Sequence, residues 1–148
     1  MSATIHTPAP PARDHIVRVL HWPDALIERS GYPVDHPYVE MFWLPVLGPT
    51  ATWLARRLVG GLHTAPEGYD CDVAEMARAL GVSYSPGRNN PFARALQRCA
   101  MFGVSQQIAI EPVHTIAVRT VLPRIPQRHL ARLPETMRTA HDDWVGAH

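Results

Sequence analysis

Two runs decide the fold of this chain: DVAEMARALG at residues 72–81 and NPFARALQRCAMFG at residues 90–103. Each predicts a short helix. In the first run Asp72 stands at the N-cap with Glu75 three residues later, which is a capping-box spacing that satisfies free backbone N–H groups. Gly81 follows as a residue that tolerates the left-handed conformation beyond a helix end. Both ends of the first helix are therefore marked.

The second run also has residues that mark the start of a helix, and its helix would have two different faces. Asn90 is the expected cap, and Pro91 takes the first helical position, where a missing N–H costs nothing. Helical spacing places the apolar residues on one side and the polar ones on the other. The apolar side comprises Phe92, Ala95, Leu96, Cys99 and Phe102; the opposite side comprises Arg94, Gln97, Arg98 and Met101. Such a helix packs on a core with one face and presents the other.

Alternation after the second helix predicts a two-stranded hairpin. The strands are expected at residues 106–110 and 115–121, with Pro112 in the loop. We expect Ile108 and Ile110 to face Ile116 and Val118 across the pair. A third short strand is predicted at Tyr69–Cys71, directly before the first helix.

The order helix, turn, helix, hairpin resembles the winged helix-turn-helix superfamily, over roughly residues 50–122. The resemblance implies a mainly α fold with a small antiparallel sheet: a winged helix-turn-helix core at about residues 49–122, with N- and C-terminal helical extensions. Residues 51–61 would be the first helix of its three-helix core. The connection from Val82 to Asn89 departs from the family pattern, because it exceeds the three- or four-residue turn of a compact helix-turn-helix.

The flanking segments predict one domain with an arm. Residues 1–14 are expected to form a disordered, proline-rich arm, and residues 15–148 a single domain. The most apolar stretch, residues 38–47, either plugs the core or forms a seam between two subunits. We favour the seam, because proteins of the resembled family commonly dimerise through added flanking elements. Apolar residues also recur at heptad-like spacing in residues 130–144, which pack either on the N-terminal segment or on a second subunit. The expectation is a homodimer through residues 38–47 and 126–145.

Charge is distributed unevenly along the chain. The net charge is +1, from 14 Arg and 13 acidic residues with no lysine. Residues 1–71 hold five Arg and seven acidic residues (−2), residues 72–132 hold eight and three (+5), and residues 133–148 hold one and three (−2). The positive charge thus falls on the segment that includes the predicted helices and hairpin, which favours a polyanionic partner.

Motifs of catalysis, metal binding and membrane insertion do not stand out. The nine histidines show no HxxxH or HExxH spacing, and Cys71 and Cys99 lie on predicted inward faces as reduced thiols. No Walker, GxSxG or GxGxxG sequence is present. No apolar run is long enough to cross a membrane. We therefore expect a cytoplasmic protein that is not an enzyme and has no metal or cofactor.

The resulting hypothesis is a DNA-binding protein, a transcriptional regulator that contacts duplex DNA through the helix 90–103 and the wing 106–121. Arg94, Gln97 and Arg98 would contact bases or phosphates, since Arg and Gln can each bond two acceptors or donors on one base edge. The alternative is a winged-helix module for protein–protein interaction in a transcription or replication assembly. The remaining predicted DNA contacts are Arg88, Asn89 and Asn90 before the helix, and His114 and Arg119 on the wing.

Overall fold

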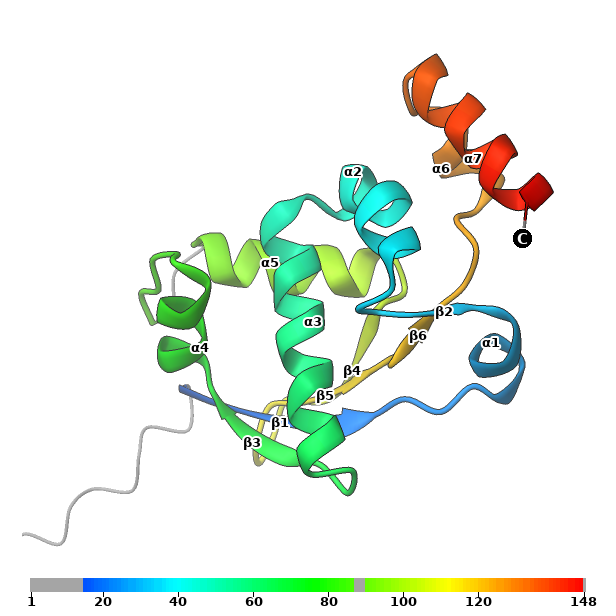
Figure 1. Cartoon of the computed structure of the whole chain (residues 1–148). Coiled ribbons are helices and arrows are strands. Elements are labelled where there is room, and N and C mark those ends of the chain that lie inside the picture. Colours follow the sequence, from blue (N-terminus) through cyan, green and yellow to red (C-terminus); the bar gives the residue numbers. More distant parts are fainter. Residues whose placement is uncertain (1–14, 87–89, 148) are drawn as a thin grey trace, which may run out of the picture.

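A four-stranded sheet in the order β3–β1–β5–β4 underlies the fold in this computed structural model, which describes residues 15–86 and 90–147 (Figure 1). β1 is antiparallel to β3 and parallel to β5, and β4 is antiparallel to β5. The strands are β1 (Ile16–His21), β3 (Tyr69–Asp72), β4 (Ser105–Ala109) and β5 (Thr115–Val118).

This sheet corrects the predicted fold class. A mainly α winged helix-turn-helix with a small antiparallel sheet is wrong, because β1 lies between β3 and β5 and makes the sheet mixed. Val17 and Val19 are 5% and 0% exposed, so a central position buries both side chains. The strand partners of β1 lie 50 or more residues away in sequence (Val19 and Tyr69 are the nearest pair), so they leave no local signal. A second sheet pairs β2 (Tyr32–Pro33) with β6 (Val121–Leu122).

Three helices adjoin the sheet. They are α3 (Pro49–Thr64), α4 (Val73–Leu80) and α5 (Pro91–Met101). Figure 1 shows α3 and α5 crossing, and the two helices are in direct contact. α3 carries its buried side chains, including Leu54, Leu58 and Leu62, at spacings of three and four residues, which fits a helix with one face in the core.

The predicted helix ends are confirmed. The Asp72 carboxylate accepts a hydrogen bond from the Glu75 N–H at 3.1 Å. The Asn90 side-chain oxygen accepts one from the Ala93 N–H at 3.0 Å, with Pro91 in the first turn. Gly81 has φ of 73°, the left-handed conformation that ends α4.

The hairpin forms, but with a different register from the predicted one. Ser105 pairs with Val118 and Gln107 with Ile116, and a bulge follows between Gln107 and Ala109. An extra residue in one strand turns the following side chains to the other face. The expected pairing of Ile108 and Ile110 with Ile116 and Val118 is therefore wrong, and these two isoleucines are 51% and 63% exposed.

The apolar segment 38–47 continues through its proline. It forms a π-helix, η2 (Val39–Trp43), and then α2 (Leu44–Leu47). Pro45 occupies the first turn of α2, where its missing N–H is not needed. Tyr38, Phe42 and Trp43 are at most 2% exposed within this single chain. For these three residues the core interpretation holds.

The C-terminal helices pack on that segment. They are α6 (Gln127–Leu130) and α7 (Glu135–Ala147), beyond β6 in Figure 1. The Tyr38 hydroxyl accepts a hydrogen bond from the Ile125 N–H and lies 2.8 Å from His141 Nε2. The two segments predicted to join subunits thus contact each other inside one chain, and a homodimer stays a prediction.

The N-terminal part adds one short helix, α1 (Ala25–Ser30), which is capped by Asp24. Among the described residues, no helix is both long enough and apolar enough to span a bilayer.

Candidate nucleic-acid interface

α5 has the two faces that its sequence predicted. Phe92, Ala95 and Cys99 are at most 4% exposed, and burial raises the pKa of the Cys99 thiol to about 12. Cys99 is therefore an inert core residue at neutral pH. The opposite face is open to solvent, and Met101 on it is 67% exposed. Arg94, Gln97 and Arg98 share that exposed face.

A hollow of about 500 Å³ separates this face from the start of α3. We call it the α3–α5 hollow. Its walls come from residues 47–51 on one side and from α5 on the other. Both arginines of α5 and Gln97 line it, so the positive side chains stand beside a concave surface rather than on an isolated ridge. Concavity of this kind brings several protein groups within reach of one ligand.

The two arginines differ in what they already bind. Arg98 donates from Nε to the Leu47 carbonyl and from Nη2 to the Val46 carbonyl, both at 2.8 Å. Its guanidinium also lies 5.5 Å from the centre of the Phe102 ring. These carbonyls end α2, where a cation is favourable. Arg98 therefore holds the corner between α2 and α3, although its charge remains near the surface.

Arg94 and Gln97 make no comparable contacts within the described part of the chain. Neither side chain makes a hydrogen bond or an ion pair with any residue that the structure describes, and both are exposed. An exposed guanidinium and a carboxamide one helical turn apart can contact the same partner. These two side chains are the part of the predicted site that is ready for an external ligand.

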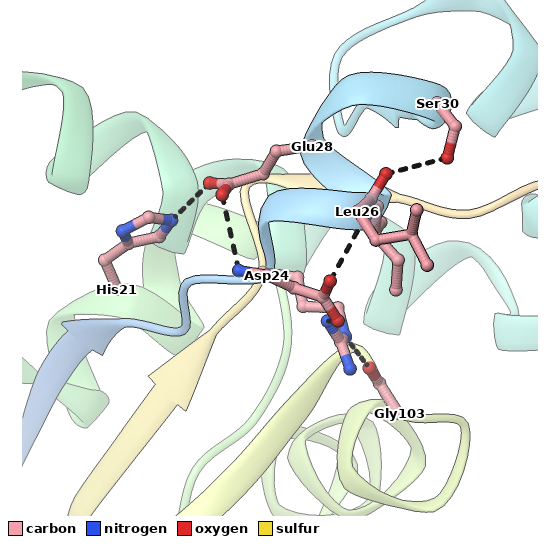
Figure 2. A network of polar contacts seen from close by, with 8 residues as sticks. His21, Asp24, Leu26, Glu28, Ser30 and Gly103 are labelled. Carbon is pink, nitrogen blue, oxygen red and sulfur yellow. Dashed lines mark hydrogen bonds and ion pairs between the residues drawn. The ribbon is translucent and has the colours of Figure 1, made fainter.

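The Arg119 side chain serves the fold, and Figure 2 shows two of its partners, Asp24 and Gly103. Its Nη1 lies 3.0 Å from the Asp24 carboxylate, its Nε donates to the Gly103 carbonyl at 2.8 Å, and its guanidinium is stacked 3.6 Å from the centre of the Trp22 ring. The side chain is 14% exposed. We call this arrangement the Arg119 corner. It joins α1, β5 and the end of α5.

The Asp24 carboxylate serves two elements at this corner. It caps α1 by accepting a hydrogen bond from the Ile27 N–H at 3.2 Å, and it pairs with Arg119. The Ile27 N–H, followed by Arg119, lowers the pKa of Asp24 below its ordinary value. Figure 2 also shows Glu28 between the Asp24 N–H and His21, whose Nε2 is 2.9 Å from the Glu28 carboxylate. The charge of Arg119 is thus balanced within the chain.

The other predicted contacts fall into three groups. Asn90 is 7% exposed; it caps α5 and donates to the Ser85 carbonyl at 2.9 Å, so it orders the helix start. Arg88 and Asn89 lie outside the described residues. His114 is half-buried just before β5, and burial lowers its pKa. It lies near Gln97 across a second, smaller hollow.

Two arginines, Arg128 on α6 and Arg132 just after it, were missed from the sequence. Arg128 and Arg132 are exposed and flank His129, whose ring centre lies 5.1 Å from that of Phe102 at the end of α5. Burial first, and then the charges of Arg128 and Arg132, lower the pKa of His129. The His129–Phe102 contact places α6 next to the C-terminal end of α5. A signal was present: residues 90–132 hold six Arg and one Glu, hence 6 − 1 = +5.

No group of three His, Cys, Asp or Glu side chains suited to a metal ion occurs among the described residues. Comparison with protein-family models, curated proteins and solved structures found no match to this chain.

Proposed function

We propose that the protein binds duplex DNA through the exposed face of α5. Arg94 and Gln97 are the residues assigned to base edges, because a guanidinium or a carboxamide can form paired hydrogen bonds with one base in the major groove. Arg128 on α6 and Arg132 just after it are assigned to phosphates, which fix the position of a protein on the duplex. In this proposal the phosphate contacts come from Arg128 and Arg132 and not from the wing.

The observation that carries the proposal is the unpaired state of Arg94 on a surface almost free of carboxylates. In the described part of the chain, the four ion pairs found involve Arg18, His21, Arg56 and Arg119, and none of them is on α5 or α6. An unbalanced cluster of guanidiniums attracts a polyanion and releases counterions on binding.

The experiment is a salt titration of affinity, measured by fluorescence anisotropy with a labelled random-sequence duplex. If three to four phosphates are neutralised, the logarithm of the association constant should fall with the logarithm of salt with a slope of roughly −3. Weak binding at every salt concentration would contradict the proposal. That result would favour the alternative, a protein-interaction module, for which the exposed Met101 on the same face is suited.

A further inference from the structure

A second hollow, of about 350 Å³, lies between α5 and the hairpin β4–β5. We call it the α5–hairpin hollow. One wall is a helical stripe at spacings of three, four and seven residues, and the other is a row of alternate strand residues. The helical wall comprises Ala93, Leu96, Gln97 and Ala100; the hairpin wall comprises Ser105, Gln107, His114 and Ile116.

The space arises from residue size and register. Ala93 and Ala100 are short side chains at the two ends of the helical stripe, so α5 stands over the hairpin without filling the gap. Ser105 and Gln107 face α5 because they are paired with Val118 and Ile116, whose side chains share that face of the sheet. Leu96 and Ile116 supply an apolar surface within the same hollow.

The polar groups around this hollow have no partners in the described chain. Ser105 is 3% exposed, yet its hydroxyl makes no hydrogen bond to any residue within 15–86 or 90–147. The carboxamides of Gln97 and Gln107 and the ring of His114 are likewise without a hydrogen-bond partner among those residues. The Ser105 hydroxyl is not sealed inside the protein, so a ligand in the hollow can reach it and supply the missing hydrogen-bond partner.

The side chains that line the hollow also disfavour a charged ligand. Among the residues that the structure describes, no Asp, Glu, Lys or Arg side chain borders the hollow. Burial lowers the pKa of His114, which favours its neutral imidazole near pH 7. Two carboxamides, an imidazole and a hydroxyl offer both donors and acceptors, so they suit a neutral ligand whose edge alternates donors and acceptors.

We propose that the α5–hairpin hollow binds one neutral heteroaromatic ring of nucleobase size. Leu96 and Ile116 would cover the faces of the ring, while Gln97 and Gln107 would pair with its edge, as carboxamides pair with a base edge. The volume is near the lower end of the range for small-molecule sites, roughly 300–1,000 Å³. The ring can come from a free nucleoside or from a base displaced from a strand. This site does not depend on duplex binding, although Gln97 also belongs to the proposed duplex surface.

The experiment is an amide-resolved NMR titration of the full chain with adenosine, guanosine, cytidine and thymidine. At least one should produce saturable shifts at residues 93–100, 105–107 and 114–116. The affinity should stay constant when salt is raised, because the ligand is neutral. Ala100→Leu should weaken binding at least ten-fold by filling the hollow, whereas Ala79→Leu, at an exposed position of α4, should leave it unchanged. Gln107→Leu should weaken it about five-fold through loss of one hydrogen bond.

A second arm identifies the source of the ring. A single strand carrying the preferred base is compared with the same strand with that base removed. Shifts at the hollow that need the base assign the site to displaced bases, and shifts with the nucleoside alone assign it to a free ligand. Absence of saturable shifts in both arms, or shifts elsewhere only, would overturn the proposal. Arg94→Ala should keep nucleoside binding, which separates failure of this site from failure of duplex binding.

Discussion

The Arg119 corner, just beyond the C-terminal end of α5, and the exposed face of α5 both contain arginines, but they differ in what surrounds the charge. At the corner, the Arg119 guanidinium contacts a carboxylate, a backbone carbonyl and an indole ring. On α5, Arg94 has no hydrogen-bond or ion-pair partner among the described residues. The comparison shows that the presence of an arginine marks positive charge, whereas its neighbours decide whether that charge is available to a ligand.

Arg98 stands between these two cases. It shares the exposed face of α5 with Arg94, yet two of its nitrogens bind backbone carbonyls of α2. The three arginines form a graded series. Arg119 serves the fold, Arg98 does so in part, and Arg94 has no hydrogen-bond or ion-pair partner among the described residues. Substitution of each residue tests this order.

The largest loss of stability is expected from Arg119→Ala. The change removes the stacking on Trp22, takes one hydrogen-bond donor from the Asp24 carboxylate and leaves the Gly103 carbonyl without the Arg119 donor, so the free energy of unfolding should fall by about 2–3 kcal/mol. Urea unfolding measures it. Arg29→Ala on α1, an exposed arginine, is the matched control and should change stability by less than about 0.5 kcal/mol. Equal stability of the two variants would show that the corner does not support the fold.

Arg98→Ala should have an intermediate effect of about 1–2 kcal/mol, because two hydrogen bonds from a charged donor to the end of α2 are lost. The same urea experiment applies. Arg98→Lys should restore only part of the loss, since a single ammonium does not reproduce the paired geometry of the guanidinium. Full recovery with Lys would indicate that charge alone, and not the two bonds, matters at this position.

A smaller effect on stability is expected at acidic pH, and it concerns the Arg119 corner but not α5. The folded-state pKa of Asp24 lies below its ordinary value, so its contribution to stability is complete above that ordinary value and is lost as the pH falls through the folded pKa. The difference in melting temperature between the wild type and Asp24→Asn should therefore narrow from about pH 5 to about pH 2. A constant difference over this range would mean that Asp24 does not act through its charge.

The local structure was largely predictable, whereas the tertiary partners were not. Asp72 and Asn90 cap α4 and α5 as their spacing indicated, because capping depends on residues three positions away. The two faces of α5 followed from helical periodicity for the same reason. The sheet order depended on a pairing between β1 and β5, and no local pattern encodes a partner so distant in sequence.

The same distinction between local structure and tertiary contacts applies to the candidate site. Sequence placed Arg94 and Gln97 on the open face of α5 correctly, but it could not foresee that Asp24 and Trp22, about 95 residues away, enclose Arg119. Arg128 and Arg132 were visible only as part of a basic segment, since their place beside α5 depends on the contact between His129 and Phe102. Availability of a charge is a tertiary property.

The smallest change in stability and the most direct test of the account both come from Arg94→Ala. Stability should stay within about 0.5 kcal/mol of the wild type. In the duplex salt titration, the affinity should fall, and the magnitude of the salt slope should decrease by about 1, because one neutralised phosphate is lost. Arg29→Ala should leave both quantities unchanged. A slope and an affinity in Arg94→Ala equal to those of the wild type would contradict the assignment of duplex binding to the exposed face of α5.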